Sequence, residues 1–205
     1  MSNEAIIKSK KDIIAIGRLL WDKELVTGLN GNISTRVEDD KILLTATQTC
    51  LGLLQENEIL ILNLSGEVLE PGQVSTEKLL HTSIYQNFPY VKAVIHTHLT
   101  YANAFFLEND HFSPRIFEAK FYLGEINAIP QTTPSVTDSQ PVIETLKKNN
   151  IAVLKNHGVV AIGENLFDCF LLIQGLEDAV KVETISRFFT QGSRVTSYER
   201  RTIID

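Results

Sequence analysis

Two histidines separated by one residue, His96 and His98, end the mostly apolar segment 91–95. This segment predicts a short buried strand. Because side chains alternate between the two faces of a strand, both imidazoles should project from the same face at its end. Imidazole nitrogens are common metal ligands. A His-x-His pair is by itself a weak motif in a chain with five histidines. Whether it marks a metal site depends on which other residues the fold places beside it.

A third histidine, His157, follows the apolar run 151–154 and precedes Gly158. Three neutral imidazoles with one open position form a common catalytic zinc site, with Zn–N distances of about 2.0–2.1 Å. We therefore expect His96, His98 and His157 to bind one zinc ion. Zinc is favoured over iron because a facial iron site would use two histidines and a carboxylate.

Glu77 is the carboxylate that we expect to lie near the three histidines. It follows Ser75 and Thr76 at the start of the predicted helix 75–85, where the helix dipole favours a negative charge. A role as a capping acid and a role in chemistry are therefore both open from the residues alone. His81, one helical turn later, is expected to be a structural histidine, and His111, in a polar loop, to be exposed to solvent.

The loop 28–34 contains two glycines and two asparagines. Such a loop can adopt backbone angles that direct consecutive N–H groups at an anion. The composition favours the simpler interpretation, a turn that leads into a strand.

The elements that must position these residues alternate between helical and strand patterns. Apolar residues at helical spacing predict an opening helix over 4–23, and the hairpin 33–37 and 41–47 indicates antiparallel pairing. We expect an α/β fold in one domain, residues 1–205, with a largely antiparallel central sheet and helices packed on it. Further helices are predicted at 101–106, 138–149 and 166–190, further strands at 59–62, 126–129, 151–154 and 159–162, and a polar mobile tail at 192–205.

The composition excludes several classes of protein. With 43% hydrophobic and 21% charged residues, the chain is typical of a globular protein, and no apolar run approaches the roughly 18 residues of a membrane span. A net charge of −6 without basic clusters argues against nucleic acid as the main partner. The first residues do not resemble a secretory signal, so we expect a cytoplasmic location and read Cys50 and Cys169 as reduced thiols.

Five short motifs, in this order, resemble the class II aldolase and adducin family. They are Gly31-Asn32-Ile33-Ser34, Thr45-Ala46-Thr47, Ser75-Thr76-Glu77, His96-Thr97-His98 and Asn156-His157-Gly158. A cupin barrel also carries His-x-His, but its following glutamate has no counterpart here. The resemblance implies a zinc enzyme with a three-layer α/β/α fold, usually a homotetramer with active sites at subunit interfaces.

The resemblance also implies roles for single residues. His96, His98 and His157 match the zinc ligands, and Glu77 matches the catalytic acid/base. The positions that hold the substrate phosphate are matched by Asn32, Thr47, Ser75 and Thr76. The implied activity is that of a zinc-dependent lyase that breaks a carbon–carbon bond of a phosphorylated sugar or sugar acid through an enediolate.

One departure from the family pattern bears on the reaction. Aldolases and epimerases of the family usually have glycine where Gln48 stands, so the segment 45–54 looks most like the branch that decarboxylates 3-oxo-tetronate phosphates. The tyrosine that aldolases supply from a neighbouring subunit has no clear match, and Glu118, Lys120 and Tyr122 are all candidates for a second proton-transfer group. The alternatives are a sugar-phosphate 4-epimerase or dehydratase, and a non-catalytic adducin-like interaction domain, against which the histidines and Glu77 speak.

Overall fold

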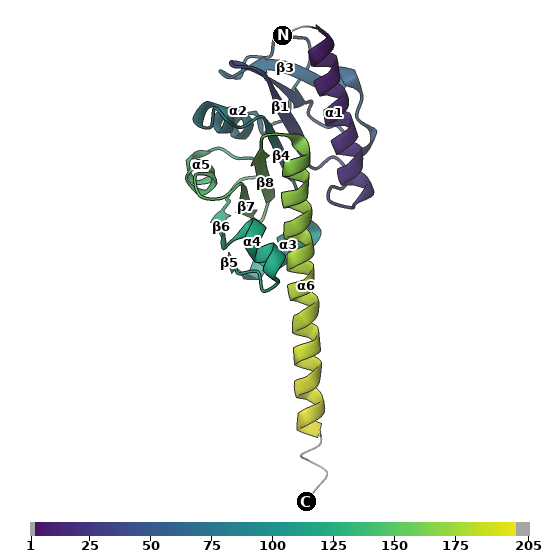
Figure 1. The fold of residues 1–205 in the computed structure, drawn as a ribbon, viewed down its shortest axis with the longest axis vertical. Coiled ribbons are helices and arrows are strands. Elements are labelled where there is room, and N and C mark those ends of the chain that lie inside the picture. Colours follow the sequence, from purple (N-terminus) through teal and green to yellow (C-terminus); the bar gives the residue numbers. More distant parts are fainter. Residues whose placement is uncertain (1–2, 200–205) are drawn as a thin grey trace, which may run out of the picture.

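A computed structural model describes the backbone of residues 3–199 and the side chains of residues 3–189. Its strands form one eight-stranded sheet in the order β3-β2-β1-β4-β8-β7-β6-β5 (Figure 1). The strands are β1 Asn32–Glu38, β2 Lys41–Thr45, β3 Ile59–Asn63, β4 Ala93–Thr97, β5 His111–Phe112, β6 Ile126–Pro130, β7 Ile151–Lys155 and β8 Gly158–Gly163. The α-helices are α1 Asn3–Asp22, α2 Lys78–Asn87, α3 Thr100–Glu108, α4 Phe117–Leu123, α5 Gln140–Leu146 and α6 Leu166–Glu199, with short 3-10 turns at Leu51–Leu53 and Glu56–Glu58.

The sheet is mixed, which corrects the expectation from the sequence. Neighbouring strands pair antiparallel except for β6 and β7, which run parallel. Parallel neighbours need a crossover connection, and α5 lies in the chain between these two strands. The hairpin signals at the start of the chain indicated only antiparallel pairing.

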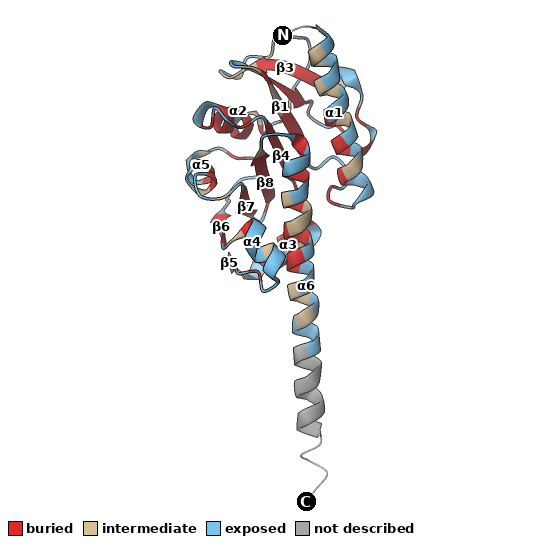
Figure 2. Cartoon of the chain, in the orientation of Figure 1, coloured by how far each residue is buried: buried red, intermediate tan, exposed pale blue. Residues whose placement is uncertain are grey.

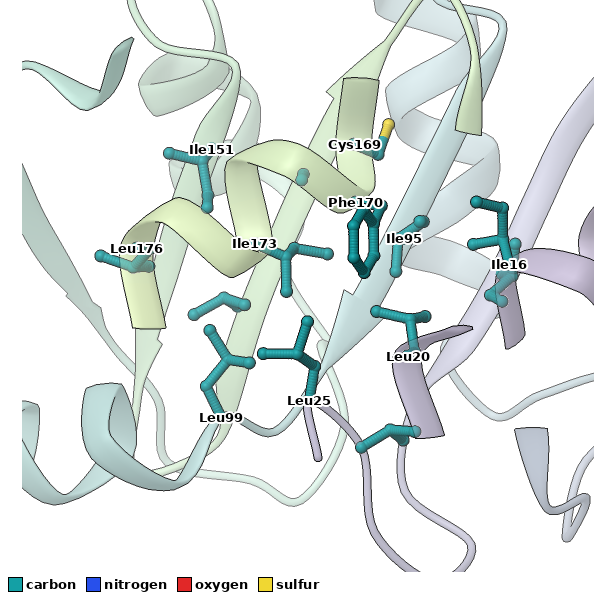
Figure 3. Close-up of a cluster of buried hydrophobic side chains, with 14 of the residues drawn as sticks. Ile16, Leu20, Leu25, Ile95, Leu99, Ile151, Cys169, Phe170, Ile173 and Leu176 are labelled. Carbon is teal, nitrogen blue, oxygen red and sulfur yellow. The ribbon is translucent and has the colours of Figure 1, made fainter. Parts of the chain in front are cut away.

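Alternate residues of the central strands enter two separate hydrophobic cores. In β4, Ile95 belongs to the core that also contains α1, α3, α4 and α6, whereas Val94 belongs to the core under α2 and α5. The strands and the inner faces of the helices are accordingly buried (Figure 2). Figure 3 shows the first core, where Ile173 and Phe170 of α6 pack near Ile95 and Leu20. The predicted α/β/α layering is therefore confirmed.

Several boundaries differ from the predicted ones. Helix α2 begins at Lys78 rather than Ser75, and β4 ends at Thr97, so His98 lies just beyond the strand. Helix α6 continues to Glu199, so the expectation of a tail from residue 192 is wrong up to that residue, and residues 200–205 lie outside the described part. The two-residue strand β5 was not predicted. In the described residues, no helix combines the length and the apolar character needed to cross a lipid bilayer.

Candidate active site

The three predicted metal ligands converge on one point. The Nε2 atom of His96 lies 3.1 Å from Nε2 of His98 and 3.2 Å from Nε2 of His157. Ligands at Zn–N distances of about 2.0–2.1 Å in a tetrahedral site lie about 3.3–3.4 Å from one another. The spacing of the three nitrogens therefore fits a single metal ion.

Two strands and a tight turn position these imidazoles. His96 is in β4, which pairs with β8, and His157 lies in the turn between β7 and β8. Asn156 turns the chain there with a φ of 63°, which asparagine tolerates better than most residues. At Gly158 an added Cβ would lie 2.5 Å from the carbonyl oxygen of Thr97 and 2.8 Å from Cδ2 of His98. Glycine is needed at this position because two ligand-bearing segments meet there.

The hydrogen bonds and burial of the rings suit metal binding. Nδ1 of His96 donates to the main-chain carbonyl of Val159 at 2.9 Å, so its Nε2 presents a lone pair to the centre. Burial lowers the pKa of all three histidines, that of His98 to about 4, which favours the neutral ligand form. Buried Nδ1 of His157 has no hydrogen-bond partner among the described residues, while the Asn103 amide donates to the main-chain oxygen of His157 at 3.2 Å.

Glu77 faces this centre from the beginning of α2. It is the N-cap residue, yet its side chain makes no capping hydrogen bond, which argues against the capping role. Its carboxylate is buried, accepts a hydrogen bond from the main-chain N–H of Val136 at 3.1 Å, and lies 3.6 Å from Nε2 of His157. Burial raises the pKa of Glu77, and the hydrogen bond from Val136 opposes this only in part.

The residues matched to a phosphate site line the same cavity. This cavity of about 190 Å³ contains Glu77 and the three histidines together with Asn32, Thr47, Ser75 and Thr76. Asn32 sits directly across from His96 in the β1–β4 ladder. The hydroxyl of Ser75 accepts a hydrogen bond from the main-chain N–H of Glu77 at 3.2 Å. The fold thus brings together residues that are up to 125 positions apart in sequence, Asn32 to His157.

The glycine-rich loop contributes four consecutive residues to the cavity. The N–H of Asn30 bonds to the carbonyl of Thr27 in a plain turn, as the simpler interpretation predicts. The lining residues of this loop are Leu29, Asn30, Gly31 and Asn32. Gln48, which also lines the cavity, has a φ of 58°, the left-handed conformation that glycine adopts without strain. A glutamine and a glycine at this position can therefore adopt the same backbone conformation.

The candidates for a second proton-transfer group lie elsewhere in this chain. Glu118, Lys120 and Tyr122 are exposed on α4, on the far side of the sheet from α2, and none of them lines the described cavity. His111 is exposed as expected and pairs with Glu125 at 2.8 Å. His81 is fully buried, and its ring bonds to Ser34 and Asn32 rather than to Glu77.

Sequence reasoning missed three supporting residues, Asn103, Val136 and Val159. The last two act through main-chain groups, which carry no residue signature. The role of Asn103 depends on the packing of α3 against the turn that carries His157, which no local pattern reveals.

Comparison with known proteins assigns the chain to a family. Residues 11–184 match the family described as Class II Aldolase and Adducin N-terminal domain, and the chain belongs to this family. An L-fuculose phosphate aldolase of Methanocaldococcus jannaschii is 34% identical over 178 residues, which cover 86% of this chain and 96% of the relative. A 3-oxo-tetronate 4-phosphate decarboxylase of Haemophilus influenzae is 28% identical over 199 residues, which cover 92% of this chain and 91% of the relative.

Solved structures agree with the fold. The crystal structure of L-fuculose-1-phosphate aldolase from Thermus thermophilus superposes with a TM-score of 0.81 at 23% identity, covering 88% of this chain and 95% of that one. The two relatives named above are an aldolase and a decarboxylase, both of which are lyases, and this chain is an enzyme of the same family. The names of these relatives favour an enzyme over a non-catalytic interaction domain.

Proposed function

We propose that this chain is a zinc-dependent lyase that breaks a carbon–carbon bond in a phosphorylated sugar or sugar acid. The observation that carries the proposal is the meeting of three Nε2 atoms, one buried carboxylate and several neutral hydrogen-bonding side chains in a single cavity. The names of the relatives, an L-fuculose phosphate aldolase and a 3-oxo-tetronate 4-phosphate decarboxylase, support the same class of substrate.

The metal would be held by His96, His98 and His157. When bound, zinc supplies a Lewis acid that polarises a substrate carbonyl and stabilises the negative charge that develops beside it. Glu77 is then the group that moves the proton. Its burial raises its pKa toward the range in which a carboxylate works as an acid and a base near neutral pH.

The phosphate would be bound at the beginning of α2. Ser75 and Thr76 precede this ten-residue helix, whose N-terminal end favours an anion through its dipole. Asn32 and Thr47 add a carboxamide and a hydroxyl from the other wall of the cavity. These donors are neutral, so they recognise the phosphate by hydrogen bonds rather than by an ion pair.

Metal analysis and a substrate screen test the proposal. We expect the purified full chain to contain about one zinc per chain, and chelation to abolish its turnover while added zinc restores it. The screen uses phosphorylated ketoses and 3-oxo-tetronate 4-phosphates, with dihydroxyacetone phosphate as the product detected. Activity that is indifferent to chelation would refute the proposal.

The products of the screen also decide the kind of lyase. Gln48 at the position where aldolases of the family usually have glycine favours a decarboxylase, which would release carbon dioxide and dihydroxyacetone phosphate. An aldolase would release an aldehyde with the same phosphate. Inversion of a stereocentre, or loss of water without fragmentation, would instead identify an epimerase or a dehydratase.

We further propose that the chain forms a homotetramer in which neighbouring chains complete each active site. Helices α4 and α6 expose large apolar side chains, among them Phe117 and Phe121 with 88% and 83% of their surface accessible. Between these helices lies a hollow of about 880 Å³ with a largely apolar lining. An exposed apolar surface of this kind is typical of a protein–protein interface. On such an interface Glu118, Lys120 or Tyr122 would approach the cavity of a neighbouring chain.

Two measurements test the assembly. Light scattering should give the mass of four chains, and Phe121→Ser should reduce it. Glu118→Gln, Lys120→Met and Tyr122→Phe then show which of the three side chains turnover needs. If that residue acts across the interface, coexpression with a Glu77→Gln chain should restore about a quarter of the sites by random mixing of chains. Two inactive chains that stay inactive together would contradict a shared site.

A further inference from the structure

Four buried side chains form a continuous hydrogen-bonded chain that ends in the cavity. The hydroxyl of Tyr85 lies 2.9 Å from Oγ of Ser34, and Oγ of Ser34 lies 2.6 Å from Nδ1 of His81. On the other side of the ring, Nε2 of His81 lies 2.5 Å from Oδ1 of Asn32. Only Asn32 lines the cavity with the histidines and Glu77, whereas the other three lie behind it.

The orientation of the Asn32 carboxamide in the structure sets the direction of every hydrogen bond in this series of side chains. Oδ1 of Asn32 is a carbonyl oxygen and can only accept, so Nε2 of His81 carries the proton. Nδ1 of the neutral ring then accepts from the hydroxyl of Ser34, and Ser34, having given its only proton, accepts from Tyr85. Burial lowers the pKa of His81 to about 3, which agrees with a neutral ring.

This arrangement couples the orientation of the Asn32 carboxamide to the tautomer of the His81 ring. A carboxamide has two orientations related by a half-turn, and only one of them places its oxygen toward the N–H of His81. In that orientation the NH₂ group of Asn32 remains for the cavity. The cavity therefore receives a donor, which an anion requires, rather than an acceptor, which an anion would repel.

Because these four hydrogen-bonded side chains are buried, breaking one of their hydrogen bonds would cost free energy. His81 is fully buried, and Tyr85 and Ser34 are almost as inaccessible. A polar group left without a partner in such an environment is strongly unfavourable, so the carboxamide can turn only if the His81 ring changes tautomer and the hydroxyls of Ser34 and Tyr85 reverse with it. The hydrogen bonds thus hold the donor in place before any substrate binds.

We propose that His81 is a positioning residue, fixed by Ser34 and Tyr85, that keeps the NH₂ group of Asn32 directed into the cavity and thereby sets its affinity for the phosphate group of the substrate. The inference rests on the proposed function, because it assumes that Asn32 contacts that phosphate. His81 does not line the cavity, so it would act on the phosphate through Asn32.

Binding of inorganic phosphate to the zinc-loaded full chain tests the proposal by calorimetry. We expect His81→Leu and Asn32→Ala each to weaken binding about 10-fold or more, the usual effect of losing a hydrogen bond to a charged group. The double variant should bind no more weakly than Asn32→Ala alone, because both changes remove the same contact. His81→Gln should restore much of the affinity, since its amide can donate to Asn32 and accept from Ser34.

The controls separate this inference from the proposed function. Ser34→Ala should weaken phosphate binding if His81→Leu does not fold, whereas Ser83→Ala, which deletes a part-buried hydroxyl of α2 bonded to Ser139, should not. Unchanged binding in both His81→Leu and Ser34→Ala, or additive losses with Asn32→Ala, would overturn the role of His81 alone. A zinc-loaded wild-type chain that does not bind phosphate would overturn the phosphate site and this inference with it.

Discussion

Nδ1 of His96 lies 2.9 Å from the main-chain carbonyl oxygen of Val159, on the neighbouring strand. This hydrogen bond ties the ring of the most buried ligand to the sheet and leaves its Nε2 for the metal. His157 is held differently, since its own Nδ1 lacks a partner in the described residues and Asn103 instead holds its main chain. The metal centre therefore depends on how closely the turn before β8 approaches the end of β4.

Replacement of Gly158 by alanine tests that dependence. A Cβ there would lie 2.5 Å from the carbonyl oxygen of Thr97, closer than atoms tolerate, so the turn must move away from His98. We expect zinc affinity to fall about 10-fold to 100-fold, as it does when the support of a ligand is lost. Competition with a chromophoric chelator measures it. Gly175→Ala is the control, because a Cβ at Gly175 meets nothing within 4 Å, and equal affinities in both variants would contradict the expectation.

The strands and helices could be predicted from the sequence because their patterns are local. The continuous apolar runs of β4 and β8 and the helical spacing in α1 depend only on neighbouring residues. The parallel pairing of β6 with β7 depends on where α5 packs, which is a property of the whole fold. The end of β4 before His98 likewise depends on its partner strand.

The site could be predicted only in part for the same reason. The spacing of His96 and His98 predicted a shared metal, and the structure brings their Nε2 atoms together although His98 lies outside the strand. Asn32 came from the resemblance to a family, not from its own surroundings. The N–H of Val136 and the carbonyl of Val159 belong to the main chain, so no residue type in the sequence predicts their role.

Glu77→Gln should separate chemistry from metal binding. Glutamine has the same shape and can still accept from the N–H of Val136, but it cannot carry the proton. We expect turnover to fall about 10²-fold to 10⁴-fold with the zinc content unchanged. Because burial raises the pKa of Glu77, removing its charge should also stabilise the metal-free chain at neutral pH.

A second buried glutamate provides the matched control. Glu177 accepts hydrogen bonds from the N–H groups of Tyr101 and Ala102, at 2.8 and 3.0 Å, and so caps the beginning of α3. Glu177→Gln should lower the free energy of unfolding by about 1 kcal/mol and leave zinc content and turnover unchanged. Full turnover in Glu77→Gln would show that Glu77 is not the proton carrier.

His81 predicts how the stability of the chain depends on pH. Its pKa in the folded chain is lowered to about 3 by burial from an ordinary value of 6.5, so its contribution to stability is complete above pH 6.5 and is lost as the pH falls toward 3. Between pH 7 and pH 5 the metal-free wild type should lose about 2 kcal/mol more than His81→Gln. Urea unfolding at both pH values, with chelator present, measures the difference. Equal losses in the two chains would mean that His81 binds a proton in the folded state.

Gln48 offers a test of whether backbone strain at the cavity serves binding. A glutamine with φ of 58° is less favourable than a glycine by about 1 kcal/mol, so Gln48→Gly should leave stability unchanged or raise it slightly. If the glutamine side chain binds the substrate, the same variant should raise KM with little change in kcat, because the contact is made equally before and during the reaction. Glu24→Gly, at a φ of 57° outside the cavity, should affect stability in the same direction and leave KM unchanged. An unaltered KM in Gln48→Gly would show that only the backbone of this residue matters, and the distinction from aldolases at this position would then have no bearing on the substrate.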